Sequence, residues 1–104
     1  MKEDDQPLET RLNTETGRIT WGELERHFAR GVLVRVQPEL DLVAVAAAFV
    51  RDDEPAVMAW MTARQVWRAT AEDARDWHDR DPVLWAVVAA PWVLVQEPAS
   101  APSA

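Results

Sequence analysis

The chain alternates between segments with helical hydrophobic spacing and shorter apolar runs. Apolar residues recur three or four positions apart in five segments, and this spacing predicts five helices. Short runs rich in β-branched residues lie between or after these segments, and they predict strands. The expected helices cover about 8–16, 20–30, 41–51, 52–64 and 70–81, and the expected strands cover 32–36, 66–69 and 83–95.

Two pairs of polar residues mark where helices begin. Thr20 and Glu23 form a capping box, in which each side chain meets the backbone of the other residue. Thr70 and Asp73 repeat this pattern before the last expected helix. Both helices are therefore predicted on two independent signals, the cap and the hydrophobic spacing.

The last apolar run, residues 83–95, is typical of a strand that is buried on both faces. Pro91 lies inside it and cannot donate a backbone hydrogen bond, so we expect a bulge, a bend or an edge position that divides the run in two. The element order is then ααβααβαβ(β). Because helices join most of the strands, parallel crossovers are favoured. The sequence predicts an α+β (mixed α/β) fold, in which a small sheet of three to four strands packs with helices.

Length and composition suggest one globular domain over residues 8–97. The chain has 104 residues, of which 48% are hydrophobic and 28% are charged, a mixture typical of folded proteins. No internal repeat or Gly/Ser linker marks a second domain. The polar ends, 1–7 and 98–104, are expected to be flexible.

Charge and cysteine content limit the cellular location and the kinds of partner that we expect for this protein. The chain has no cysteine, and its acidic start does not resemble an export signal, so a cytoplasmic location is expected. The longest apolar run, 82–95, is shorter than the ~18 residues that cross a bilayer. The net charge of -7 opposes binding to phosphates. Neither a membrane nor a nucleic acid is therefore an expected partner.

Several motifs in this sequence are similar to those of one protein family. They are Leu12-x-x-Glu15-Thr16-x-x-Ile19-x-Trp21-x-Glu23-Leu24, Phe28-Ala29-Arg30-Gly31, Leu40-Asp41-Leu42-Val43 and the run from Leu84 to Gln96. Together they resemble a family of small bacterial proteins known only as a domain of unknown function. The likeness covers about residues 8–97, and the ending Ala-Pro-Trp-Val-Leu-Val-Gln is its most specific part. The resemblance implies a bacterial cytoplasmic protein and no particular activity, cofactor or catalytic residue.

The residue inventory argues against covalent catalysis. The chain has neither cysteine nor tyrosine, its only lysine is Lys2, and its only serines are Ser100 and Ser103 in the tail. The three glycines do not match a phosphate loop or a dinucleotide turn, and Gly17 and Gly31 suit left-handed helix ends. No nucleotide cofactor is therefore expected.

Two histidine clusters are the remaining candidates for chemistry. His27 lies one helical turn after Glu23, and His78 lies among acidic residues near the end of the last expected helix. Neither cluster has a recognised metal-ligand spacing, so no metal or cofactor is predicted. The alternative hypothesis is a small-molecule-binding protein or a metal-assisted hydrolase. Its candidate residues are His27, His78, Asp76, Arg30 and Arg35.

The leading hypothesis is a non-enzymatic protein-interaction or structural module that self-associates, with a dimer favoured. Six tryptophans are many for this length, and some should line an interface. The long apolar run also exceeds what a small sheet covers easily, and an uncovered edge invites pairing. The interface candidates are Trp85, Trp92, Val93 and Val95.

Overall fold

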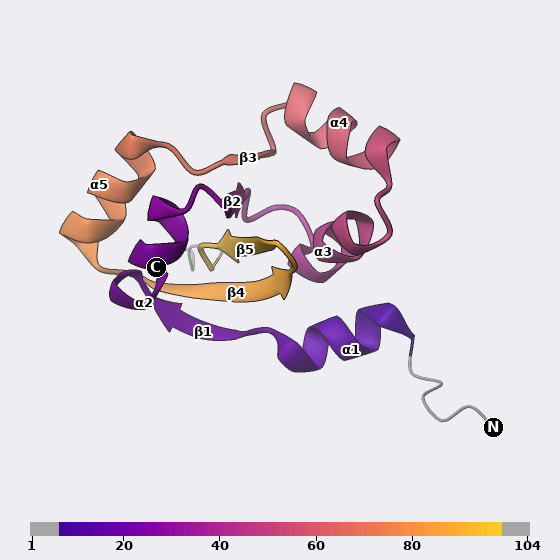
Figure 1. Ribbon diagram of the computed structural model, residues 1–104, viewed down its shortest axis with the longest axis horizontal. Coiled ribbons are helices and arrows are strands. Elements are labelled where there is room, and N and C mark those ends of the chain that lie inside the picture. Colours follow the sequence, from indigo (N-terminus) through magenta and orange to yellow (C-terminus); the bar gives the residue numbers. More distant parts are fainter. Residues whose placement is uncertain (1–6, 99–104) are drawn as a thin grey trace, which may run out of the picture.

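The computed structural model describes residues 7–98, which form one five-stranded sheet with helices on both faces (Figure 1). The predicted flexible ends lie almost wholly outside the described residues, as do Lys2, Ser100 and Ser103. No helix in the described part is both long and apolar enough to span a bilayer. In chain order the elements are α1 (Leu8–Glu15), β1 (Gly17–Thr20), α2 (Trp21–Ala29), β2 (Leu33–Val36), α3 (Leu42–Val50), α4 (Glu54–Thr62), β3 (Val66–Arg68), α5 (Ala71–Arg80), β4 (Val83–Ala89) and β5 (Trp92–Gln96).

The sheet has the strand order β1-β4-β5-β2-β3, and only β5 and β2 pair in parallel. The predicted α+β class is therefore confirmed, and so is the division of the last apolar run, because β4 and β5 form an antiparallel hairpin around Pro91. The prediction of three to four strands missed β1. Its four residues, Gly17–Thr20, are mostly exposed at the sheet edge and show no run of apolar residues.

Strand residues alternate between two hydrophobic cores, one on each face of the sheet. On one face Val34, Val36 and Leu94 pack with residues of α1 and α3. On the other face Leu33 and Val95 pack with residues of α2 and α5. Side chains in successive strand positions point to opposite faces, so a strand buried on both must be apolar throughout. Each such side chain stabilises the fold by about 1.5–3 kcal/mol on burial.

The predicted caps largely explain where the helices begin and end. Thr70 and Asp73 make the reciprocal bonds at the start of α5, with the two backbone N–H groups 3.0 and 3.1 Å from their side-chain acceptors. Gly31 has a φ of +76°, as expected for a residue just past a helix. The same prediction for Gly17 is wrong. Thr16 ends α1 in extended backbone, and its hydroxyl donates to the Leu12 carbonyl oxygen, so Gly17 begins a strand.

Arg35 is the only charged residue in β2, and a network of ion pairs and indoles surrounds it. Its guanidinium donates to Asp73 at 2.7 Å and to Glu97 at 3.3 Å, which ties β2 to α5 and to the segment after β5. The indole N–H of Trp67 donates to Asp73, and that of Trp77 donates to Glu97, each over 2.9 Å. These bonds let a sheet face covered by helices contain a partly buried charge, since such a charge needs partners.

Replacing Asp73 should therefore destabilise the protein more than replacing an exposed acid of the same helix. Asp73→Ala leaves the Trp67 indole and part of Arg35 unpaired and removes a cap, so we expect the free energy of unfolding to fall by about 2–3 kcal/mol. The matched control is Asp79→Ala, whose side chain is 70% exposed. Urea unfolding followed by tryptophan fluorescence measures both variants. Equal losses in the two would contradict the importance of the network.

Acid should weaken the ion pair between Asp76 and Arg80 within α5. Arg80 donates to Asp76 and to Glu97, and its hydrogen bonds lower the pKa of Asp76. A carboxyl with a lowered pKa stabilises the fold above its unfolded-state pKa, and the effect disappears as pH falls through the folded-state pKa. Asp76→Asn should thus flatten the fall in stability below about pH 4. Thermal unfolding across pH measures this, and an unchanged slope would refute it.

Candidate functional site

Helix α4 is apolar and yet has no buried residue. Asp53 caps it by accepting from the Ala56 N–H at 3.3 Å, and Pro55 lies in its first turn. Met58 is 59% exposed and Met61 is 39% exposed, whereas α3, directly before it, buries five of its residues. Large exposed apolar surfaces on folded proteins often mark interaction sites. The exposed side of α4 is therefore the first candidate functional surface.

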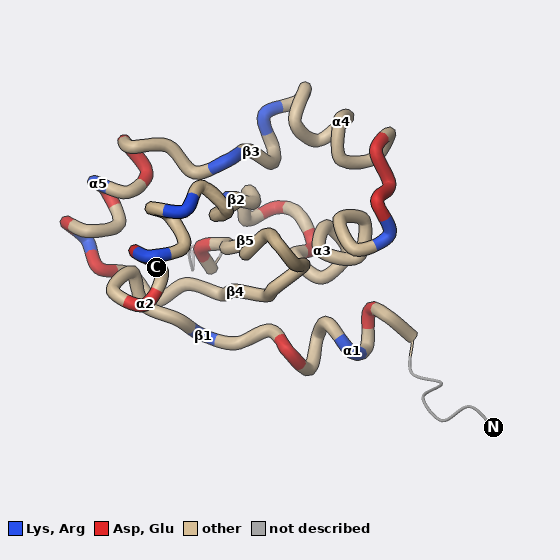
Figure 2. Tube along the Cα trace, viewed as in Figure 1, with Lys and Arg blue, Asp and Glu red and all other residues tan. Residues whose placement is uncertain are grey.

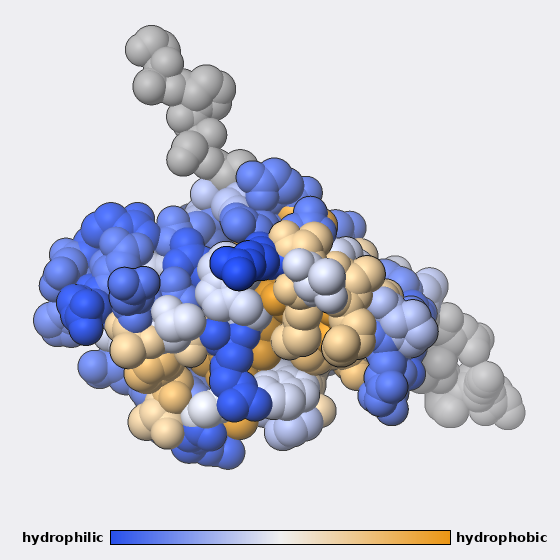
Figure 3. Space-filling view, turned by 90° about the horizontal axis from the view of Figure 1, so that it is seen from above, coloured by the Kyte–Doolittle hydropathy of each residue, from blue (hydrophilic) through white to orange (hydrophobic). Residues whose placement is uncertain are grey.

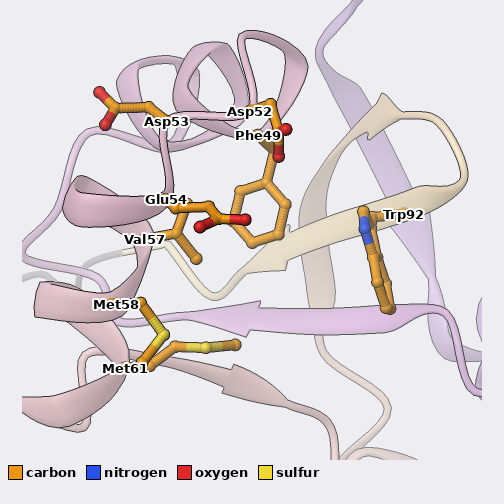
Figure 4. Close-up of a pocket in the computed structure, with 8 residues that line it drawn as sticks. All are labelled: Phe49, Asp52, Asp53, Glu54, Val57, Met58, Met61 and Trp92. Atoms are coloured by element: carbon orange, nitrogen blue, oxygen red, sulfur yellow. The ribbon is translucent and has the colours of Figure 1, made fainter.

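A hollow of about 420 Å³ lies between α4, the end of α3 and the start of β5. Phe49 and Trp92 form its aromatic part, with ring centroids 6.5 Å apart. Figure 4 shows the side chains of Met58 and Met61 extending from α4 toward the space in front of Trp92. Methionine is flexible and polarizable, which suits a surface that must fit a partner side chain. We call this apolar surface, made by Phe49, Val57, Met58, Met61 and Trp92, the α4 face.

Charges of opposite sign lie at the two ends of the α4 face. Asp52, Asp53 and Glu54 form an acidic segment at the start of α4 and line the hollow. Arg64 follows the end of the helix, and the Arg68 guanidinium lies 5.5 Å from the centre of the Trp92 ring. Figure 2 shows acidic residues before α4 and basic residues after it and in β3, and Figure 3 shows hydrophobic surface gathered between polar regions over α4. The α4 face is thus apolar in the middle, with negative charge near the start of the helix and positive charge near its end.

Of the four predicted interface residues, the two tryptophans are half-buried and the two valines lie in the core. Trp92 is half-buried and belongs to the α4 face, while Trp85 is half-buried beside α1 and α3 with the Arg18 guanidinium 5.1 Å from its ring centre. Val93 is only 7% exposed and Val95 is fully buried. Both valines lie beneath α2 and α5, because β5 is an inner strand covered on both faces. Their place in the fold is the core.

The predicted ligand or metal residues do not converge on one site. His27 of α2 is half-buried beside Ile19 of β1. His78 is exposed on α5, and its Nδ1 atom lies 3.5 Å from the Asp79 Oδ1 atom. Asp76 pairs with Arg80, Arg35 lies in its own network, and Arg30 is the exposed C-cap of α2. Within residues 7–98, no group of three or more His, Cys, Asp or Glu side chains lies close enough to hold a metal ion. These residues have structural roles or face solvent individually.

Sequence reasoning did not identify the α4 face. The sequence contains one sign of this surface: α4 has no fully polar side, because its apolar residues include Val57, Met58, Trp60 and Met61. Such a helix is normally buried all round, so sequence alone favours a core position. Which side stays uncovered depends on how α4 packs against α3 and β3, and only the folded chain shows this packing.

Comparisons with known proteins give a family and a fold. A family model described as "Protein of unknown function (DUF2288)" matches residues 7–97. The NMR solution structure of PA1075 from Pseudomonas aeruginosa is similar to this chain, with a TM-score of 0.82 and 43% sequence identity, and the match covers 100% of this chain and 96% of that one. No curated protein matches the chain. The resemblance drawn from the sequence motifs is confirmed, and the chain belongs to the DUF2288 family of proteins of unknown function.

Proposed function

We propose that this protein is a non-enzymatic interaction module in which the α4 face of one copy contacts the α4 face of a second copy. The observation that carries the proposal is that α4 is apolar while none of its residues is buried. Burying apolar surface gains about 25 cal/mol per Å², and a helix lying in an apolar groove is a common way to do so. The cytoplasm is the proposed location, on composition alone.

The charges at the two ends of α4 favour a second copy over an unrelated partner. A two-fold axis that crosses the helix near Met58 places two α4 helices side by side and antiparallel. The start of each helix then lies beside the end of the other, so Glu54 and Asp53 of one copy face Arg64 of its partner. The apolar centres of the two helices meet between these charged ends. One surface therefore supplies both halves of a complementary contact, as a two-fold interface requires.

We expect the association to be reversible and weak. A contact made mainly by one nine-residue helix buries little surface, and small interfaces are typical of transient complexes. A dissociation constant of roughly 10–100 µM is consistent with such a contact. Salt should weaken it only moderately, because the acidic and basic ends are exposed and the centre is apolar.

Placing a charge in the centre of the α4 face should separate the copies. Met58→Glu puts an unpaired carboxylate between two apolar helices, so we expect dimerisation to weaken at least about tenfold. Val88→Glu is the matched control, because Val88 is 57% exposed and lies on the opposite sheet face from Trp92. Sedimentation velocity over a concentration series measures both. A wild-type chain that stays monomeric to about 500 µM, or equal effects of the two variants, would refute the proposal.

Reversing one charged end at a time should test the antiparallel arrangement. Glu54→Arg and Arg64→Glu each place like charges together across the axis, and each should weaken the dimer about three- to tenfold. A mixture of the two single variants should form a mixed dimer, since both of its charged contacts join opposite charges, one as the native pair and one as a reversed pair. Native mass spectrometry counts the mixed species. A purely statistical distribution in the mixture would argue against antiparallel pairing.

A further inference from the structure

A second hollow, of about 330 Å³, lies on the α1 and α3 side of the sheet and shares no lining residue with the α4 face. Segments far apart in the sequence form it: the end of α1, the segment before α3, and the strands β4 and β5. Three of the motifs that carry the family resemblance thus meet in one place. Its polar and aromatic lining consists of Asn13, Thr16, Asp41, Trp85 and Gln96, beside Leu40.

Hydrogen bonds hold the walls of this hollow in place. The Gln96 side-chain amide donates to the carbonyl oxygens of Gln37 and Leu40 at 2.9 and 2.8 Å, which fastens the segment before α3 to β5. The Asp41 Oδ1 atom accepts from the backbone N–H groups of Val43 and Ala44 at the start of α3. A site whose groups are already fixed loses little entropy when a ligand binds.

Several polar groups on the residues that line the hollow are accessible to a ligand, because these residues are exposed or half-buried. Within residues 7–98, the Asn13 amide, the second carboxylate oxygen of Asp41, the Gln96 amide oxygen and the Trp85 indole N–H have no side-chain hydrogen bond. Two of these groups are acceptors only, the indole is a donor, and the Asn13 amide can act as either. A molecule with several hydroxyl groups can satisfy all of them, because each hydroxyl both donates and accepts.

The charges and the shape of the hollow further limit the chemical class of ligand that could bind there. The Arg18 guanidinium lies 5.1 Å from the centre of the Trp85 ring and would repel a cation placed beside that ring. Asp41 would repel an anion. Trp85 lines the hollow and is half-buried, so the part of its side chain that stays exposed there gives an apolar surface against which the C–H groups of a saturated ring can pack. We infer that this hollow is a binding site for a small, neutral, hydroxyl-rich ring compound of the sugar class.

Three ring compounds of nearly the same shape distinguish the possible charges: glucose is neutral, glucosamine is cationic and glucuronate is anionic. Each is titrated into the full 15N-labelled chain, and the indole N–H signals of the six tryptophans are followed by NMR. We expect glucose to move the Trp85 signal along a saturable curve while the Trp21 and Trp77 signals stay in place. Both charged analogues should bind at least about threefold more weakly. No saturable change with glucose to about 100 mM, equal changes at all six indoles, or tighter binding of a charged analogue would overturn the inference.

Variants of residues that line the hollow distinguish specific binding from a general effect of adding sugar to the solution. Asn13→Ala removes an exposed side chain that makes no hydrogen bond within residues 7–98, and it should weaken glucose binding about three- to tenfold. Thr14→Ala is the control one residue further on, since Thr14 is exposed and its hydroxyl bonds back within α1. Trp85→Phe keeps an aromatic ring but removes the indole N–H; its binding is followed through the backbone amides of β4 and should also be weaker. Equal affinity of Asn13→Ala and wild type would overturn the inference.

Discussion

Burial of the central strands on both faces is the constraint on which the whole arrangement depends. β2 and β5 lie inside the sheet order and pair with each other in parallel. Their successive side chains supply both hydrophobic cores, so helices must cover both sides of the sheet. α1 and α3 cover one side, and α2 and α5 cover the other. α4 lies at the margin of this arrangement, where it contacts mainly α3 and the three-residue edge strand β3, with Trp60 packed against the core.

The same constraint explains the two features to which we assign roles. One side of α4 remains uncovered because the fold has no second layer over it, and covering the exposed Met58 and Met61 side chains would add hydrophobic stabilisation. The walls of the hollow beside Trp85 are fixed because Gln96 bonds the segment before α3 to the end of β5, and Asp41 caps α3. Arg35 is a contrasting case, since Asp73 and Glu97 satisfy its charge within the fold.

Local sequence signals predicted most of the secondary structure but little of the candidate sites. Capping pairs such as Thr70 and Asp73 are local, so the helix starts could be read directly. β1 was missed because a short edge strand needs only one paired neighbour and no apolar pattern. Val93 and Val95 were expected at an interface because their run is long, but strand order decides that they are covered. Both hollows join residues that are distant in sequence, and only the packed fold brings these residues together.

Hydrogen exchange in α4 at low and high protein concentration tests the central claim most directly. Backbone amides of Glu54–Thr62 should exchange several-fold more slowly in concentrated protein, because a second copy then covers the helix. Amides of α5, on the other face of the sheet, should exchange at the same rate under both conditions. Exchange in α4 that does not change with concentration, or that changes equally in α5, would contradict association through this helix.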